Sequence, residues 1–193
     1  ATTLITHFVK WWIENYAGDE DPRANDPFRI SILSPNSIDK TWQREAILPL
    51  AEFGVITSHI RTISHSKLSR ITAVSAILEK PSANGLSDFE HLVLSDLVIV
   101  DEAHNFLPAQ GKTAATDPLL TLITQGRQPG ISCAFITQRP NKLHADAVSQ
   151  ADMVISHRLT SKEDLDSLSS IMQTYLLEGI TKSMNQLPDL KGS

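Results

Sequence analysis

Leu-Val-Ile-Val-Asp-Glu-Ala-His, at residues 97–104, is the stretch of sequence that decides the fold. Four apolar residues are followed directly by two carboxylates, Asp101 and Glu102. A continuous, mostly β-branched apolar run of this length is typical of a buried strand in a parallel sheet. Ligands of open α/β sheets bind beyond the carboxyl ends of the strands, so both acids are predicted to face a ligand site. The alternative interpretation is a strand followed by an acidic loop or helix cap.

Two adjacent carboxylates at such a strand end suit nucleotide hydrolysis that depends on Mg²⁺. Asp101 can hold Mg²⁺, usually through a water ligand of the metal. Glu102 can polarise the water that attacks the phosphate. The sequence therefore predicts a metal-binding role for the first acid and a catalytic role for the second.

Predicted helices and strands alternate along the rest of the chain. We expect a helix in residues 4–13, a helix through Trp42, Ile47 and Leu50, and further helices at 71–79, around 119–123 and at 161–175. Strands are expected at residues 28–33, 54–63, 131–137 and 153–156, with a polar connection at 64–70. This alternation predicts one α/β domain over residues 1–193, a three-layer sandwich with a mainly parallel central sheet between helices.

The composition fits a cytoplasmic globular protein. The chain has 193 residues, a formal net charge of −5 and a single cysteine, Cys133, which is expected in the core. No apolar stretch approaches the ~20 residues that span a bilayer, and no secretory signal opens the sequence, so no membrane association is expected. The acidic balance argues against indiscriminate nucleic-acid binding, although a local basic stripe is compatible with it.

A second polar strand end follows the predicted strand at 131–137. Thr137 and Gln138 come directly after an apolar run, and a parallel neighbour of the first strand would bring them to the same edge as the two acids. A neutral hydroxyl or amide there can hydrogen-bond the attacking water or the terminal phosphate. The alternative interpretation is a strand that ends in a turn at Pro140.

Three arginines are candidates for contacts with phosphate. Arg127 lies in a Gly/Pro-rich loop and Arg158 follows the last predicted strand, so either could supply positive charge during phosphoryl transfer. Arg139 could instead pair with a carboxylate or with a DNA phosphate. Each of them, taken singly, is more typical of a surface arginine.

The sequence shows no complete phosphate-binding loop. The one Gly-Lys-Thr stands at residues 111–113, and the glycine expected five positions before Gly111 is Phe106. We therefore interpret residues 111–113 as a loop and helix start. A hypothesis that explains the gap is that the first strand and the phosphate loop lie upstream of Ala1, so that the chain is a fragment.

Other catalytic patterns receive little support from the sequence. The histidines are scattered and one cysteine gives no zinc-binding spacing. No Gly-x-Ser-x-Gly elbow is present. His104 follows Glu102 closely enough to orient groups in the site, and a solvated loop histidine is the alternative.

The second half of the chain resembles the HerA/FtsK superfamily of DNA-pumping ATPases. Residues 97–106 resemble the Walker B segment of P-loop NTPases, and Ile-Thr-Gln-Arg-Pro at 136–140 followed by Ser-Gln-Ala-Asp at 149–152 is similar to that superfamily. The resemblance implies a RecA-like core, ATP and Mg²⁺ as ligands, Asp101 for the metal, Glu102 as catalytic base and Gln138 as polar sensor. It also implies assembly into rings, with an arginine from a neighbour completing the site.

The first half is similar to the first lobe of superfamily-two helicases and Swi/Snf-type remodellers. The similarity rests on Ile-Leu-Ser-Pro at 32–35, Trp-Gln-Arg-Glu at 42–45 and Ser-His-Ser-Lys-Leu-Ser at 64–69. It implies contacts with the nucleic-acid backbone, for which the candidate residues are Ser34, Pro35, Ser64, Arg70 and Arg139. Asp-Glu-Ala-His fits this group equally, but Thr-Gln-Arg-Pro departs from its usual motif and the chain contains no second lobe.

These patterns together predict an ATP-hydrolysing motor domain that acts on DNA, of translocase or packaging type. The alternatives are the first lobe of a superfamily-two DNA or RNA helicase or remodeller, and a non-catalytic NTPase-like module that does not bind ATP. A Mg²⁺-dependent phosphatase is a more distant alternative, because no nucleophilic Asp-x-Asp is present.

Overall fold

The computed structural model describes residues 6–11, 15, 28–52, 59–68, 86–125, 130–156 and 161–172. The chain divides into two compact units. The first comprises residues 1–102 and 126–136, and the second comprises residues 103–125 and 137–193. Each unit is described by itself below. The expectation of a single domain stays a prediction.

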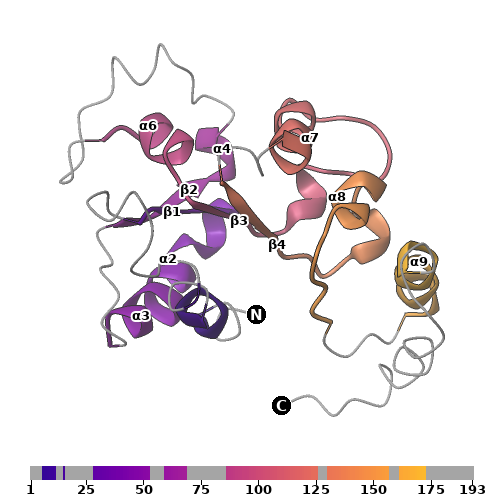
Figure 1. The fold of residues 1–193 in the computed structure, drawn as a ribbon, viewed down its shortest axis with the longest axis horizontal. Helices are drawn as coiled ribbons and strands as arrows, with labels where there is room; N and C mark the ends of the chain where they lie inside the picture. Colours follow the sequence, from indigo (N-terminus) through magenta and orange to yellow (C-terminus); the bar gives the residue numbers. More distant parts are fainter. Residues whose placement is uncertain are drawn as a thin grey trace. The chain divides into compact units, whose positions relative to one another are not determined.

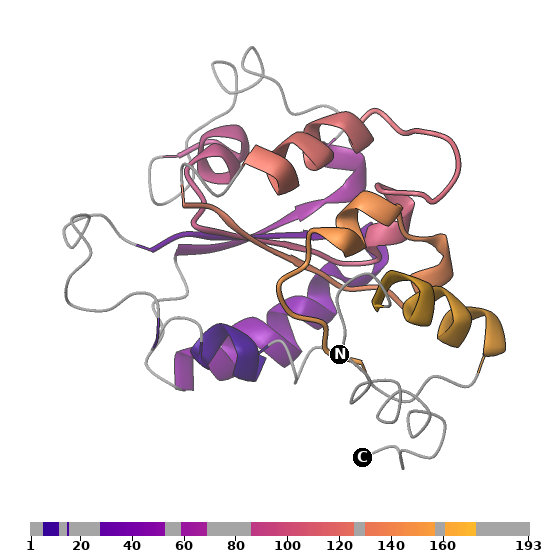
Figure 2. The ribbon, with the colours of Figure 1, turned by 45° about the vertical axis from the view of Figure 1, so that its right-hand side comes forward.

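A parallel sheet of four strands forms the centre of the first unit, as Figures 1 and 2 show. The strands are β1 (Ile30–Ser34), β2 (Ile60–Ser64), β3 (Leu97–Val100) and β4 (Ser132–Phe135). Their order is β2-β1-β3-β4, and all three strand pairs are parallel. All residues of β1 and β3, the two central strands, are buried. The continuous apolar run at 97–100 therefore forms a central strand, as predicted.

One face of the sheet packs against a helical segment that joins α2 (Asp39–Trp42), a π-helical turn (Gln43–Ile47) and α3 (Leu48–Glu52). Its buried side chains recur at helical spacing and form the core with the sheet: Trp42, Ala46, Ile47 and Leu50. The described residues of the first helix, 6–11, contribute Phe8 and Val9 to the same core.

The π turn ends at Ile47, two residues before Pro49. A proline in an α-helix cannot donate the bond to the carbonyl four residues earlier, and its ring clashes with that carbonyl. The wider turn, in which the Leu48 N–H donates to the carbonyl of Gln43, accommodates the ring. The carbonyl of Glu45 instead accepts a bond from the Thr6 hydroxyl at 3.5 Å. The helix therefore continues to Glu52.

The opposite face of the sheet carries α6 (Asp88–Val93), which begins at a Ser87/Glu90 capping box. His91 is the buried residue of α6, and its Nδ1 lies 3.1 Å from the Ser31 hydroxyl of β1. With helices on both faces, the first unit is the three-layer α/β arrangement predicted from the sequence, as Figure 2 shows.

The second unit contains the segments that follow β3 and β4. Its helices are α7 (Thr116–Gln125), α8 (Ala145–Ser149) and α9 (Lys162–Met172), with short 3₁₀ turns at Ala103–Asn105 and Pro140–Lys142. Pro108 and Leu143 form an isolated antiparallel bridge, supported by the bond from the His144 N–H to the carbonyl of Leu107. Backbone hydrogen bonds thus join the segment that follows β3, at Leu107 and Pro108, to the segment that follows β4, at Leu143 and His144.

Several predicted boundaries were wrong. Residues 153–156 do not form a strand, and Met153, Val154 and Ile155 are 61%, 44% and 59% exposed. An apolar run becomes a strand only when a partner strand is available, and the structure pairs none with this segment in its described part. The polar connection predicted at 64–70 contains the end of β2 and then a short helix, α4 (His65–Leu68).

Two further predictions need correction or lie outside the described residues. The strand expected at 54–63 begins at Ile60, and residues 53–58 are not among those described. The strand expected at 131–137 is half-buried throughout, because β4 lies at the edge of the sheet. Cys133 in β4 is consequently half-buried, yet burial still raises the pKa of its thiol to about 11. The helix expected at 71–79 lies outside the described residues.

Candidate active site

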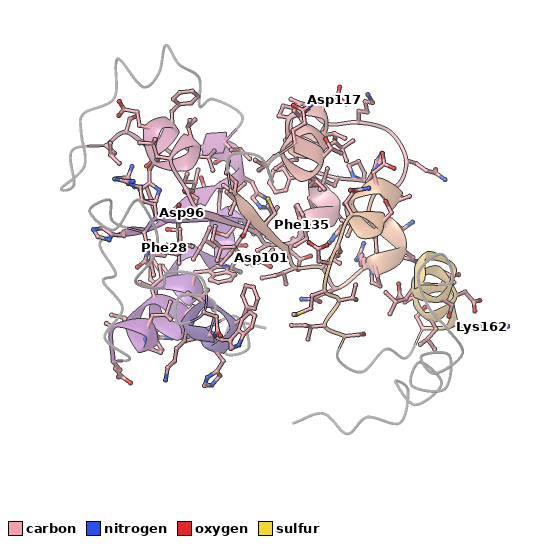
Figure 3. All side chains as sticks on the ribbon, viewed as in Figure 1. Phe28, Asp96, Asp101, Asp117, Phe135 and Lys162 are labelled. Carbon is pink, nitrogen blue, oxygen red and sulfur yellow. The ribbon has the colours of Figure 1, made fainter. Side chains whose placement is uncertain are left out.

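Asp101 stands at the carboxyl end of β3, opposite Asp96 at the other end of the strand, as Figure 3 shows. Its side chain accepts two hydrogen bonds, one on each carboxylate oxygen. The indole Nε1 of Trp42 donates to Oδ2 at 2.9 Å, and the backbone N–H of Glu102 donates to Oδ1 at 3.0 Å. The residue is only 8% exposed. The carboxylate is therefore held in one orientation at the edge of the sheet.

Glu102 has a backbone conformation that is rare for a residue with a side chain. Its φ is 51°, the one positive φ among the described non-glycine residues. The left-handed region costs roughly 1–2 kcal/mol in an L-residue, and residues that keep such strain cluster at functional sites. Glu102 is the last residue of the first of the two segments that make up the first unit, and it is half-buried.

His65, the first residue after β2, lies against the backbone that precedes Glu102. Burial lowers the pKa of its imidazole, and this effect outweighs hydrogen bonds to the carbonyls of Asp101 and Leu33 and the negative charge of Asp101, which act in the opposite direction. The neutral ring thus adds no positive charge beside Asp101 near neutral pH.

The carboxyl ends of β1 and β2 carry the predicted nucleic-acid contacts. Ser34 is fully buried, and its hydroxyl has no hydrogen-bond partner among the described residues. Pro35 and Ser64 are half-buried. The Ser66 hydroxyl donates to Asn36 Oδ1 at 3.0 Å and lies 3.4 Å from the Ser64 hydroxyl. A contact between the Ser34 hydroxyl and DNA would thus require this edge to open, and all three contacts stay predictions.

In the second unit, the Thr137 hydroxyl makes the hydrogen bonds that fix the turn after β4. The Thr137 hydroxyl lies 2.9 Å from Nδ1 of His104 and accepts the backbone N–H of Arg139 at 3.0 Å. Gln138 and Arg139 are exposed. The structure thus joins Thr137 to His104, the residue that the sequence singled out as a possible orienting group, and leaves Gln138 open to a ligand.

The Gly-Lys-Thr at residues 111–113 forms a loop before α7, as predicted. The hydroxyls of Thr113 and Thr116 both donate to the carbonyl of Phe106, at 3.0 and 2.7 Å. Lys112 pairs on the surface with Asp117 at 2.8 Å. The side chains of Lys112, Thr113 and Thr116 are thus bonded to other groups of the loop and of α7.

The remaining predicted residues lie outside the described residues: Arg70, Arg127 and Arg158. Among the residues that the structure does describe, no group of three or more His, Cys, Asp or Glu side chains gathers as a metal-binding cluster. Mg²⁺ that keeps its water ligands needs only one or two carboxylates, and each Asp101 oxygen retains an acceptor position beyond its N–H bond. Asp101 therefore fits a water-mediated Mg²⁺ site. Within the described ranges, none of the helices has the length and apolar character of a membrane span.

Sequence reasoning missed two residues of the Asp101 surroundings. Trp42 was predicted as a core residue of its helix, and His65 was placed in a polar connection. The sequence offered one usable signal: a buried tryptophan needs an acceptor for its N–H, and Asp101 was predicted at the sheet edge. Nothing in the local pattern pairs the two, because they are 59 residues apart.

Curated relatives of this chain are archaeal helicases. A probable DNA double-strand break repair helicase HerA of Methanocaldococcus jannaschii is 29% identical over 109 residues, which are 56% of this chain and 19% of that protein. HerA of Pyrococcus furiosus is 34% identical over 80 residues, 42% of this chain and 14% of that protein. A probable helicase of M. jannaschii is 26% identical over 176 residues, 88% of this chain and 28% of that protein. The chain thus spans less than a third of the length of each of these relatives.

A solved structure shares the fold. The genome packaging NTPase B204 of Sulfolobus turreted icosahedral virus 2, in complex with AMPPCP, superposes with a TM-score of 0.52 at 15% sequence identity. The superposition covers 95% of this chain and 82% of that chain. At this identity the likeness concerns the fold alone, an α/β fold with a parallel central sheet. No protein-family model matches the chain.

Proposed function

We propose that this chain, a P-loop NTPase of the HerA/FtsK type, is the ATP-hydrolysing part of a motor that acts on double-stranded DNA. The observation that carries the proposal is the adjacent acid pair at the carboxyl end of a central parallel strand. The first acid is fixed by two N–H donors, and the second has a strained backbone. A buried, oriented aspartate with a second acid directly after it suits phosphoryl transfer better than a solvated acidic loop would.

In this proposal Asp101 has a metal-binding role and Glu102 is the general base. Asp101 binds a water ligand of Mg²⁺ and keeps the metal at the sheet edge. The metal, when bound, neutralises charge that develops on the phosphate oxygens. Glu102 accepts a hydrogen bond from the attacking water and receives its proton.

The predicted phosphate contacts complete the proposal. Gln138, exposed after β4, donates its amide N–H to the terminal phosphate or the attacking water without adding negative charge. Arg127 and Arg158 are the candidates for the cation that stabilises the transition state, supplied in a ring or by a second lobe.

DNA as the substrate is supported by the names of the relatives, which are helicases and include two HerA proteins of double-strand break repair. The predicted contacts on this chain are Ser34, Pro35, Ser64, Arg70 and Arg139. Of these, Arg139 is exposed, while Ser64 and Pro35 are half-buried at the carboxyl edge of β1 and β2. Hydroxyl groups and arginine side chains of this kind contact phosphate oxygens more often than base edges.

The test is phosphate release from Mg²⁺·ATP with no nucleic acid, double-stranded DNA, single-stranded DNA or RNA. We expect hydrolysis that double-stranded DNA stimulates most, and stimulation that weakens as salt is raised, because phosphate contacts release counterions. Asp101→Ala should abolish hydrolysis under every condition. Hydrolysis that no nucleic acid changes would remove DNA from the proposal, and preference for single strands or RNA would favour the helicase alternative.

A second candidate function is a non-catalytic NTPase-like module. It is favoured by the contacts of the one Gly-Lys-Thr, whose threonine is bonded to the carbonyl of Phe106 and whose lysine pairs with Asp117. Calorimetric titration of the chain with Mg²⁺ and a non-hydrolysable ATP analogue separates the two. Micromolar affinity supports the ATPase, and no detectable heat supports the module.

A further inference from the structure

The hydrogen bond between Trp42 and Asp101 has a consequence for metal binding that goes beyond the proposed function. Trp42 Nε1 donates to Asp101 Oδ2 at 2.9 Å, and the indole is 1% exposed. We infer that Trp42 is a positioning residue, which fixes the Asp101 carboxylate for a water ligand of Mg²⁺ and thereby sets the affinity for the metal. The inference rests on the metal-binding role proposed for Asp101.

The geometry restricts the carboxylate more than a single donor would. An aspartate that accepts one bond can still rotate its other oxygen about χ2. In Asp101 the two donors act on different oxygens, Trp42 on Oδ2 and the Glu102 N–H on Oδ1, so both side-chain torsions are fixed. Four acceptor positions exist on a carboxylate, and the two that remain can hold water.

The donor itself is rigid because of the helix that carries it. Trp42 ends α2 and immediately precedes the π turn at Gln43–Ile47, a form of helix that is found often at functional sites. Further along the same helical segment, Ala46, Ile47 and Leu50 are buried in the same core cluster as Trp42. Because Trp42 is almost fully buried in a packed core, its indole has little room to turn away from Asp101. Such fixed outer partners typically contribute 10–100-fold to metal affinity or activity.

A purely structural role for Trp42 makes a different prediction. A large buried tryptophan needs an acceptor for its N–H, and Asp101 could serve only that need. Loss of the N–H would then lower the stability of the fold. It would change metal affinity no more than another core substitution does. The two roles therefore separate when metal affinity is measured beside a core control.

The experiment measures Mn²⁺ binding by electron paramagnetic resonance, with a saturating non-hydrolysable ATP analogue, for the wild-type chain and three variants. Trp42→Phe keeps an apolar ring and removes the donor. Ile47→Val is the matched control, since it trims a buried residue of the same helical segment whose side chain has no hydrogen-bond donor for Asp101. Asp101→Asn tests the metal role itself. We expect Trp42→Phe to weaken Mn²⁺ binding about 10-fold, the lower end of the usual range, and Ile47→Val to change it less than about twofold.

A second measurement needs no substitution at Trp42 in the tested protein. The indole N–H groups of the ¹⁵N-labelled chain give one cross-peak for each of its three tryptophans, and Trp11→Phe and Trp12→Phe assign the other two, which leaves the Trp42 peak. Addition of Mg²⁺ with the ATP analogue should shift the Trp42 peak, because its acceptor changes ligands. If Trp42→Phe fails to fold, the shift of this peak in the wild-type chain decides the matter.

The outcomes distinguish this inference from the proposed function. If Asp101→Asn leaves metal binding unchanged, or the wild-type chain binds no metal, both the metal role of Asp101 and the inference are overturned. If Asp101→Asn weakens binding while Trp42→Phe behaves like Ile47→Val, only the inference on Trp42 is overturned. If metal binding depends on Asp101 but the Trp42 peak does not move when the metal binds, the inference on Trp42 is likewise overturned.

Discussion

The polar groups of the two units are held in different ways. In the first unit they are buried and bonded to one another: Asp101 to Trp42, and His91 to Ser31. In the second unit, Gln138, Arg139 and Lys112 are exposed on turns and loops. Burial fixes a side chain before any ligand arrives, whereas an exposed side chain keeps more of its rotational freedom until a ligand binds. Under the proposed function, Asp101 is therefore oriented before a metal ion binds, and the exposed Gln138 becomes ordered with the bound nucleotide.

The largest expected effect is a loss of folding stability at acidic pH, caused by the buried His91 of the first unit. Burial, together with the positive charge of Arg61, lowers the pKa of His91 to about 4, and the positive charge of Arg29 acts in the same direction. The carbonyl of His59 and the carboxylate of Asp88 act in the opposite direction. Above pH 6.5 the ring is neutral in both the folded and the unfolded state. As the pH falls from 6.5 to 4, only the unfolded state takes up the proton, so stability decreases by about 3 kcal/mol.

Urea unfolding at pH 7.5 and pH 4.5 measures this loss. His91→Gln removes the titrating ring, so its stability should change less between the two pH values than that of the wild type. Equal pH dependence in the two proteins would show that His91 titrates normally and that the first unit is not as closed as described.

The second prediction concerns the Thr137 hydroxyl, the anchor of the turn after β4. Thr137→Val keeps the shape of the side chain and removes its bonds to His104 and to the Arg139 N–H. Because a hydrogen bond of this kind contributes about 1–1.5 kcal/mol, we expect a roughly 10-fold lower rate of ATP hydrolysis with unchanged metal affinity. Steady-state kinetics at saturating Mg²⁺ measures it. Thr137→Ser keeps the hydroxyl and should retain most of the rate, and a full rate in Thr137→Val would place this turn outside the reaction.

The third prediction concerns the strained backbone at Glu102, where glycine is expected to be more stable than alanine. Glycine adopts positive φ without steric cost, so Glu102→Gly should be more stable than Glu102→Ala by about 1 kcal/mol. Both variants lose the carboxylate and should lose hydrolysis alike. Chemical denaturation of the two variants measures the difference. Equal stabilities would mean that the backbone at this position is relaxed.

The smallest expected effect is at Lys112, the lysine of the Gly-Lys-Thr sequence. Its ion pair with Asp117 is exposed on both sides, and such pairs contribute little. Lys112→Ala should therefore change stability by less than about 0.5 kcal/mol and the affinity for the ATP analogue by less than about twofold. A large loss of nucleotide affinity would show that this loop binds phosphate after all.

The sequence was sufficient to predict those parts of the fold that carry a local signal. The strand at 97–100 and the helix through Trp42 and Leu50 have continuous or periodic apolar patterns, and both are present. Residues 153–156 carry a similar apolar pattern but form no strand, since pairing depends on partners elsewhere in the chain.

The candidate site was predicted only where its residues are close in sequence. Asp101 and Glu102 were identified from one strand, and Thr137 and Gln138 from another. The contacts that hold them join residues 59 positions apart, in Trp42 and Asp101, and 33 positions apart, in His104 and Thr137. Local patterns contain no information on such pairs. The π turn that accompanies Trp42 was likewise not predicted, although Pro49 in the same helix was its visible cause.

The central claim is that Glu102 performs the chemistry at the end of β3. The most direct test is a single-turnover measurement of ATP hydrolysis by Glu102→Gln, with nucleotide binding measured in the same sample and Glu163→Gln on the exposed start of α9 as the control. The account predicts that Glu102→Gln binds nucleotide within about twofold of the wild type and hydrolyses it about 10²–10⁴-fold more slowly. Hydrolysis at the wild-type rate by Glu102→Gln would contradict it.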